Sequence, residues 1–187
     1  SKYYRSFKQA AGKTLKSIII SCVTRLQPFL IPQVMNLTKT DELNLENLGD
    51  ERTALFIITP QADRTYSFLA SLLYSQIFRT LYAKGERQKA EGGDERLHIP
   101  VRCMMDELAN IGVIPNWYSL LATMRKYNIS ALMALQNIAQ LESMYDVDYK
   151  TIIGNCDTHV FLGSNSYKTV EYFSKALGEK TIFRQRI

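Results

Sequence analysis

The sequence predicts an α/β fold built on a largely parallel sheet. Through the second half of the 187-residue chain, short apolar runs alternate with segments whose apolar residues recur every three or four positions. Such runs are typical of strands buried on both faces, and strands that alternate with helices need the crossover connections of a parallel sheet. A net charge of +5 and a hydrophobic content of 46% are ordinary for a globular chain, so the composition excludes a disordered or collagen-like protein.

The first predicted element is a basic amphipathic helix. Its apolar residues are spaced by three or four from Tyr4 to Phe29, and Pro28 and Pro32 should end it. This pattern permits contact with a polyanion such as DNA, although a solvated basic face gives the same pattern. Residues 1–26 carry six cations and no acid: Lys2, Arg5, Lys8, Lys13, Lys16 and Arg25.

The rest of the chain divides into regular elements joined by polar segments. Residues 33–53 have no clear period and are expected to form a connection, and the charged segment 85–97 is expected to be a solvated loop. The other expected elements are strand 53–59, helix 66–83, strand 99–105, helix 116–126, strand 130–135, short helices 137–144 and 148–153, strand 158–162, helix 167–177 and an extended piece at 181–183.

Membrane and metal sites receive little support from the sequence. The longest strongly apolar run, Ile18 to Val23, is too short to cross a bilayer, so the chain taken alone is expected to be soluble. Three widely spaced cysteines without a CxxC pair are expected to be reduced, buried side chains. Because the chain has only two histidines, a zinc site is not expected.

The strongest candidate for chemistry is a pair of acids that follows the strand 99–105. Asp106 and Glu107 come at the carboxyl end of this strand, which is where open parallel sheets bind ligands. In P-loop ATPases an aspartate at this place holds Mg²⁺, usually through water, and the next glutamate orients or deprotonates the attacking water. The alternative interpretation is a strand that simply ends in two solvated acids.

Two further candidates flank the strand 130–135. Gln136 follows it directly, where a neutral amide can bond to both a γ-phosphate oxygen and the attacking water; a capping or loop glutamine is the alternative. Arg125 ends the preceding helix, where the helix dipole favours any cation. Its functional interpretation is an arginine finger that reaches the site of a neighbouring subunit.

One apparent phosphate-binding motif is rejected. Gly12-Lys13-Thr14 looks like the end of GxxxxGK[ST], but Phe7 stands where the first glycine is needed. The segment also has a helical period and no strand precedes it, whereas a phosphate loop needs a strand, a glycine-rich turn and then a helix.

The segment that begins at the acidic pair resembles a known family. Asp106-Glu107-Leu108-Ala109-Asn110-Ile111-Gly112, followed by Ile114-Pro115-Asn116-Trp117, is similar to the Walker B region of the TraG/TraD-type coupling proteins of conjugation and type IV secretion. The likeness continues through residues 120–127, 134–141 and 153–163 to Leu177-Gly178, and includes residues 11–17 and 56–60.

The resemblance implies a RecA-like P-loop NTPase domain: three layers, with helices on both faces of a mostly parallel sheet. Residues 33–187 would be its C-terminal portion, and residues 1–32 the end of an all-helical insertion. By the same resemblance, Asp106 would hold Mg²⁺ through water in the ATP site, Glu107 would be catalytic, Gln136 would sense the γ-phosphate and Arg125 would be the finger. The implied partners are DNA, a relaxase, secretion-channel proteins and, in a hexamer, further copies of the chain.

In this family the Walker A unit and the membrane helices lie upstream, so the chain resembles a partial domain from the cytoplasmic part of a membrane-anchored protein. We therefore expect ATPase activity, with ATP and Mg²⁺, from the intact protein and none from these 187 residues alone. Two alternatives remain open at this point. One is a DNA pump of the FtsK/HerA kind, and the other is a docking module with a degenerate nucleotide site.

Overall fold

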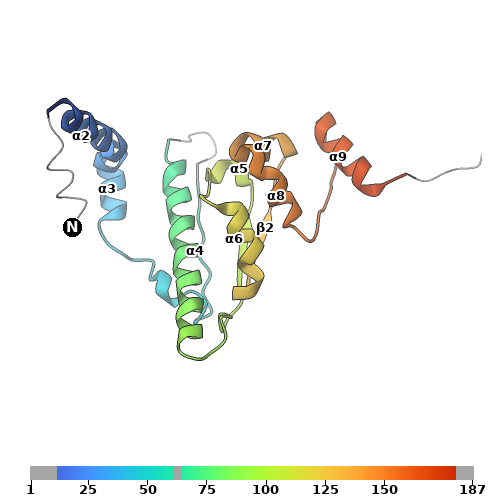
Figure 1. Ribbon diagram of the computed structural model, residues 1–187, viewed down its shortest axis with the longest axis horizontal. Helices are drawn as coiled ribbons and strands as arrows, with labels where there is room; N and C mark the ends of the chain where they lie inside the picture. Colours follow the sequence, from blue (N-terminus) through green and yellow to red (C-terminus); the bar gives the residue numbers. More distant parts are fainter. Residues whose placement is uncertain (1–11, 61–64, 180–187) are drawn as a thin grey trace, which may run out of the picture. The chain divides into compact units, whose positions relative to one another are not determined.

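The computed structural model describes residues 12–60 and 65–179 (Figure 1). The chain forms two compact units, residues 1–44 and residues 45–187. The start of the predicted basic helix and the extended piece predicted at 181–183 lie outside the described residues.

The described part of the first unit, from residue 12, is mainly helical. Helix α2 (Gly12–Leu26) is followed by the 3₁₀ turn η1 (Gln27–Leu30) and helix α3 (Pro32–Thr38). The prediction that the long helix ends near Pro28 is confirmed, whereas Pro32 begins a helix, because its missing N–H costs nothing in a first turn. In the described part of the chain no single helix has the length and apolarity to cross a membrane, but the pair Gly12–Leu30 and Pro32–Thr38, bent by 83°, passes that test together.

The second unit is built on two parallel strands. β1 (Val101–Met105) pairs with β2 (Ile129–Met133) in register, so that Val101 lies opposite Ile129 and Met105 opposite Met133. The crossover between them runs through helices α5 (Leu108–Ile111) and α6 (Trp117–Thr123) and the 3₁₀ turn η3 (Met124–Tyr127). The prediction of an α/β fold with parallel strands is therefore confirmed for this pair.

Helix α4 (Ser67–Ala90) supplies much of the core of this unit. Phe78 of α4 and Trp117 of α6 are both fully buried, and their ring centroids lie 5.2 Å apart. The remaining helices are α7 (Ile138–Tyr145), α8 (Tyr149–Gly154) and α9 (Tyr167–Leu177), with 3₁₀ turns η2 (Leu45–Asn47) and η4 (Asp146–Asp148).

Only one face of the two-stranded sheet is covered by the described residues. The side chains of Val101, Cys103 and Met105 belong to the core, as do their neighbours on β2. Alternate residues point to the opposite face. There Met104 is 71% exposed and Leu132 is 54% exposed. The predicted second layer of helices is thus not found among the described residues.

Two predicted strands are wrong. Residues 53–59 and 158–162 form no strand, and several of their apolar side chains face solvent: Phe56 is 84%, Ile58 93% and Leu162 94% exposed. The physical reason is that an apolar run indicates a tendency to be extended and buried, whereas a strand also needs a neighbour whose backbone groups complete the ladder. No described segment pairs with either run.

The predicted loop at 85–97 is wrong in its first part, because α4 continues to Ala90, whereas residues 91–97 do form a connection. Gly85 looked like a loop signal, but it marks a close packing contact inside the helix. A Cβ added at Gly85 would lie 2.5 Å from the backbone oxygen of Glu95 and 2.5 Å from Cδ1 of Tyr127. Glu95 and Leu97, which follow the helix, are buried rather than solvated.

Candidate active site

The two parallel strands end at the same edge of the sheet and bring two predicted site residues together. Gln136 donates from Nε2 to Oε2 of Glu107 at 2.9 Å, although the two residues are 29 positions apart in the sequence. We call this end of the strand pair the carboxyl edge. Asp106 and Glu107 form the turn after β1, and Gln136 lies in the loop after β2.

Backbone hydrogen bonds continue past the strands and fasten these two loops. The N–H of Ala134 donates to the oxygen of Met105 at 2.9 Å, and the N–H of Leu108 donates to the oxygen of Ala134 at 3.0 Å. Between these bonds Glu107 has a left-handed backbone, with φ 56° and ψ 66°. That conformation costs a residue with a Cβ about 1–2 kcal/mol, so the surrounding hydrogen bonds must hold it.

The sequence analysis missed a third member of the site, Gln140. Its Nε2 donates to Oε1 of Glu107 at 3.3 Å, and its Oε1 accepts from the backbone N–H of Gln136 at 2.9 Å. The available signal was the spacing Asn137-x-x-Gln140, which is typical of a capped helix start. Asn137 does cap α7, and its Oδ1 accepts from the N–H of Gln140 at 3.0 Å.

Asp106 is exposed beside this cluster. The described residues hold no group of three or more His, Cys, Asp or Glu side chains that could bind a metal by themselves. A single open carboxylate suits Mg²⁺, which keeps several of its waters and takes other ligands from substrate phosphates. The chemistry of the residues present therefore fits a magnesium ion that arrives with a nucleotide, and does not suggest a permanently bound metal.

The structure does not bring Arg125 to the other predicted site residues. Arg125 is exposed in η3, which precedes β2, so it lies at the amino edge of the strand pair. A five-residue strand is about 16 Å long, and this length separates Arg125 from the carboxyl edge of its own chain. It lines a hollow of about 390 Å³ together with Arg96, Ala122, Thr123 and Lys126.

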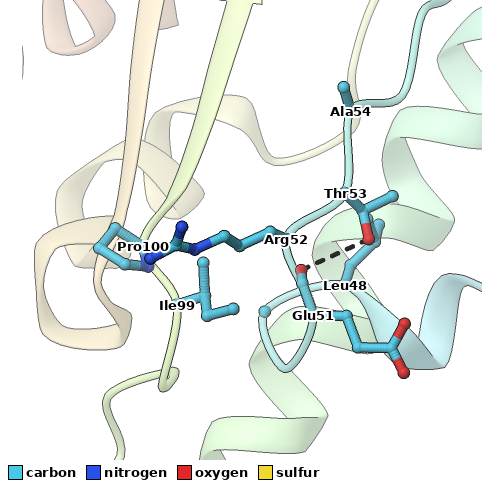
Figure 2. Close-up of a pocket in the computed structure, with 8 residues that line it drawn as sticks. Leu48, Glu51, Arg52, Thr53, Ala54, Ile99 and Pro100 are labelled. Atoms are coloured by element: carbon cyan, nitrogen blue, oxygen red, sulfur yellow. Dashed lines mark hydrogen bonds between the residues drawn. The ribbon is translucent and has the colours of Figure 1, made fainter.

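Figure 2 shows a second hollow. Its volume is about 400 Å³, and it lies between residues 48–54 and the two residues, Ile99 and Pro100, that lead into β1. Arg52 extends across it towards Pro100, and Thr53 donates from Oγ1 to the oxygen of Glu51 at 3.4 Å. This hollow is at the amino edge, so it is not part of the Glu107 cluster.

The groups beneath the cluster act as scaffold. The N–H of Ile114 donates to the hydroxyl of Tyr145 at 3.1 Å, and Trp117 donates from Nε1 to Sδ of Met133 at 3.2 Å. Burial raises the pKa of Tyr145, and the hydrogen bond from the N–H of Ile114 offsets part of this increase. Burial also raises the pKa of Cys103, to about 11. Neither group exchanges protons near neutral pH, in keeping with a scaffold role.

The fold and the cluster define a class: an α/β protein whose candidate site lies at the carboxyl edge of parallel strands. The particular family follows from comparison with known proteins. The whole chain, residues 1–187, matches the family described as type IV secretory system conjugative DNA transfer, and the chain belongs to that family. The resemblance to conjugative coupling proteins is thereby confirmed.

Individual relatives are distant but cover most of the chain. Protein VirD4 of Rhizobium rhizogenes is 25% identical over 152 residues, which is 80% of this chain and 22% of VirD4. Conjugal transfer protein TraG of Escherichia coli is 25% identical over 179 residues, which is 91% of this chain and 28% of TraG. The chain thus spans about a quarter of the length of these relatives. No solved structure matches it.

Proposed function

We propose that this chain is part of a RecA-like motor that hydrolyses ATP to drive conjugative DNA transfer. One observation carries the proposal. In a member of the conjugative DNA transfer family, the carboxylate of Glu107 and the amide of Gln136 meet at the carboxyl edge of two parallel strands. A carboxylate and an amide at that edge are the groups that nucleotide hydrolysis requires to orient water against a phosphate.

The proposed roles follow from the hydrogen bonds. The Glu107 carboxylate accepts the proton of the attacking water or orients that water. A glutamine amide has two N–H donors and an accepting oxygen. Gln136 uses one donor on Glu107 and so keeps a second donor and its side-chain oxygen for the water and the γ-phosphate. Gln136 can therefore link the presence of the phosphate to the position of the base.

Asp106 is the proposed contact to magnesium, through a bound water. Mg²⁺ supplies charge neutralisation on the phosphates during transfer. The contribution of the protein is a single exposed carboxylate next to Glu107, at the end of β1. A phosphate-binding loop from elsewhere in the intact protein would complete the site, and for this reason we propose that the 187 residues alone do not hydrolyse ATP.

Arg125 is proposed to act in the site of a neighbouring copy, because it lies at the opposite edge of the strand pair from Glu107. This role requires an assembly that apposes the amino edge of one subunit and the carboxyl edge of the next, as a hexameric ring does. We propose DNA, a relaxase and the secretion channel as the other partners of the intact, membrane-anchored protein. Residues 1–32 are proposed to end an all-helical insertion.

The test is the Glu107→Gln variant of the full-length protein. It keeps the shape of the side chain, removes its charge and replaces one of its two accepting oxygens by an NH2 donor, so a nucleotide should still bind, whereas kcat should fall by about 10³-fold. Phosphate release measures kcat, and a fluorescent ATP analogue measures the Kd.

The matched control is Glu142→Gln. It removes the carboxylate that pairs with Lys168, and both of these side chains are partly exposed. Such a pair contributes little to stability, and kcat should stay at the wild-type value. If Glu107→Gln turned over ATP like the control, the proposed function would be wrong. An intact wild-type protein without ATPase activity would instead favour a docking module.

A further inference from the structure

The cluster contains one side chain that contacts both halves of the proposed site. We infer that Gln140 is a positioning residue that sets the geometry between the Glu107 carboxylate and Gln136. This inference rests on the proposed function, since it concerns how the same site is held. The observation behind it is that the side-chain amide of Gln140 contacts two loops. Its oxygen accepts a hydrogen bond from the loop after β2, and its nitrogen donates one to the loop after β1.

The backbone of Gln140 is itself fixed. It is the third residue of helix α7, and its N–H donates to Oδ1 of the capping residue Asn137 at 3.0 Å. Its side chain is partly buried and starts from this anchored helical turn. The amide therefore extends towards the strand ends from a rigid element, which is the placement that favours accurate geometry in a site.

The side chain departs from the usual pattern at a helix start. In a capping box the glutamine at this position bonds back to the N–H of the capping residue. Here the Oε1 of Gln140 accepts from the N–H of Gln136, one residue earlier, at 2.9 Å. Its Nε2 is then directed to Glu107 at 3.3 Å. The side chain links the base and the sensor loop in addition to closing the first turn of the helix.

The chemistry of this link suits glutamine specifically. The contact with Gln136 needs an acceptor, and the contact with Glu107 needs a donor. A glutamate lacks the donor, a lysine lacks the acceptor, and an asparagine is one methylene shorter. Glutamine has both groups at the required reach.

The hydrogen bond from Gln140 fixes the orientation of the Glu107 carboxylate. Gln136 alone would hold one carboxylate oxygen, Oε2, and leave the group free to rotate about that contact. Gln140 holds the other oxygen, Oε1, so the plane of the carboxylate is defined. A misplacement of about 1 Å can lower the rate of a positioned reaction by about 10²-fold, and Glu107 already has a strained backbone that needs support.

Two variants of the full-length protein test this role. Gln140→Met keeps the length of the side chain and removes both hydrogen bonds, so we expect kcat to fall by about 10- to 100-fold. Gln140→Glu keeps an acceptor for Gln136 and places a second carboxylate against Glu107, so we expect a larger fall in kcat than in the methionine variant. In both, the Kd for a non-hydrolysable ATP analogue should stay within about twofold of wild type, because the contact acts on water and base.

A matched control separates positioning from loss of helix stability. Ala139→Gly weakens α7 by about 1 kcal/mol at an exposed neighbouring position and leaves the amide in place. We expect it to lower the Tm as much as Gln140→Met and to keep kcat near the wild-type value. An equal loss of kcat in Ala139→Gly and Gln140→Met would overturn the positioning role.

The outcomes also distinguish this inference from the proposed function. If Glu107→Gln is inactive while Gln140→Met keeps the wild-type kcat, the inference about Gln140 is wrong and the proposed function stands. If Glu107→Gln keeps the wild-type kcat, both are wrong. Loss of analogue binding in Gln140→Met, with kcat unchanged at saturating ATP, would make Gln140 a binding residue and would also overturn the inference.

Discussion

The two edges of the β1–β2 pair are held together in different ways. At the carboxyl edge, neutral amides bond to the carboxylate of Glu107, whose backbone is left-handed. At the amino edge the contacts are ion pairs in which one partner is buried and the other is partly exposed. Lys84 is 7% exposed and donates to Asp50 at 2.5 Å, and Glu95, 8% exposed, bonds to Lys89 and to Lys126.

The difference indicates which edge is built for stability. Removing a partner of a buried ion leaves that charge less well compensated and costs stability, whereas water can replace a hydrogen bond between partly exposed groups. Changes at the amino edge should therefore lower the free energy of unfolding, and changes at the carboxyl edge should lower turnover. Arg125 is the expected exception, since it is exposed at the amino edge and has a proposed catalytic role.

The substitution with the largest expected effect is Arg125→Ala. It lies at the amino edge but should lower turnover rather than stability. An arginine supplied across a subunit boundary contributes about 10³-fold or more to kcat, and loss of an exposed side chain should leave the Tm unchanged. Mixtures of Arg125→Ala and Glu107→Gln subunits should then recover part of the ATPase activity, because some interfaces combine an intact arginine with an intact glutamate.

The control for this experiment is Arg96→Ala, which removes a cation from the same hollow. Arg96 donates to Oδ1 of Asn128 at 3.2 Å, so its loss should affect local packing more than turnover. If no mixing ratio recovered activity while the assembly stayed intact, Arg125 would not act across the boundary.

A substitution at Gly85, near the amino edge, should lower stability and leave turnover nearly unchanged. Alanine is the better helix former by about 1 kcal/mol, but its Cβ would meet the Glu95 backbone and the Tyr127 ring at 2.5 Å. Because overpacking costs about 1–3 kcal/mol, we expect Gly85→Ala to lower the urea midpoint despite the gain in helix propensity. Turnover at a temperature where the variant is folded should stay within about twofold of wild type.

Gly154 gives the matched control, because it ends helix α8 and an added Cβ there has nothing within 4 Å. Gly154→Ala should leave the urea midpoint unchanged or raise it slightly. A Gly85→Ala variant as stable as this control would mean that the Glu95 loop moves away at little cost.

The smallest expected effect concerns the strand between the two edges. Burial raises the pKa of the Cys103 thiol to about 11, and burial also raises the pKa of Cys156. The thiolate is the reactive form, so at pH 8 Cys103 should be alkylated last and the exposed Cys22 first, and the rate at Cys103 should rise as the pH approaches 11. Mass spectrometry of timed iodoacetamide reactions measures this order. Equal rates in the folded protein would show that the strand pair opens readily.

Much of the fold was predictable because the signals are local. Helix α9 has the predicted bounds, and both strands lie within two residues of the predicted ones. Asp106, Glu107 and Gln136 could be selected because each directly follows an apolar run, and the ends of parallel strands meet at one edge. Their catalytic roles stay predictions.

The features that could not be predicted depend on contacts between distant segments. The runs 53–59 and 158–162 have strand composition but no described neighbour to pair with. Gly85 indicates a loop until Glu95 and Tyr127 are seen to pack against it. Gln140 is an ordinary residue of a capped helix in the sequence, and only its distance to Glu107 reveals the contact.

The left-handed backbone of Glu107 has a consequence for engineering. At φ 56° a glycine would pay none of the steric cost that glutamate pays, so the glycine substitution is the one that favours this turn. In a selection for heat resistance this gain would act against the two hydrogen bonds that the Glu107 carboxylate accepts and against the greater chain entropy of glycine in the unfolded state. With Glu107 as the proposed base, this substitution would remove turnover whatever it does to stability, so selection schemes for this protein need to report on activity at every round.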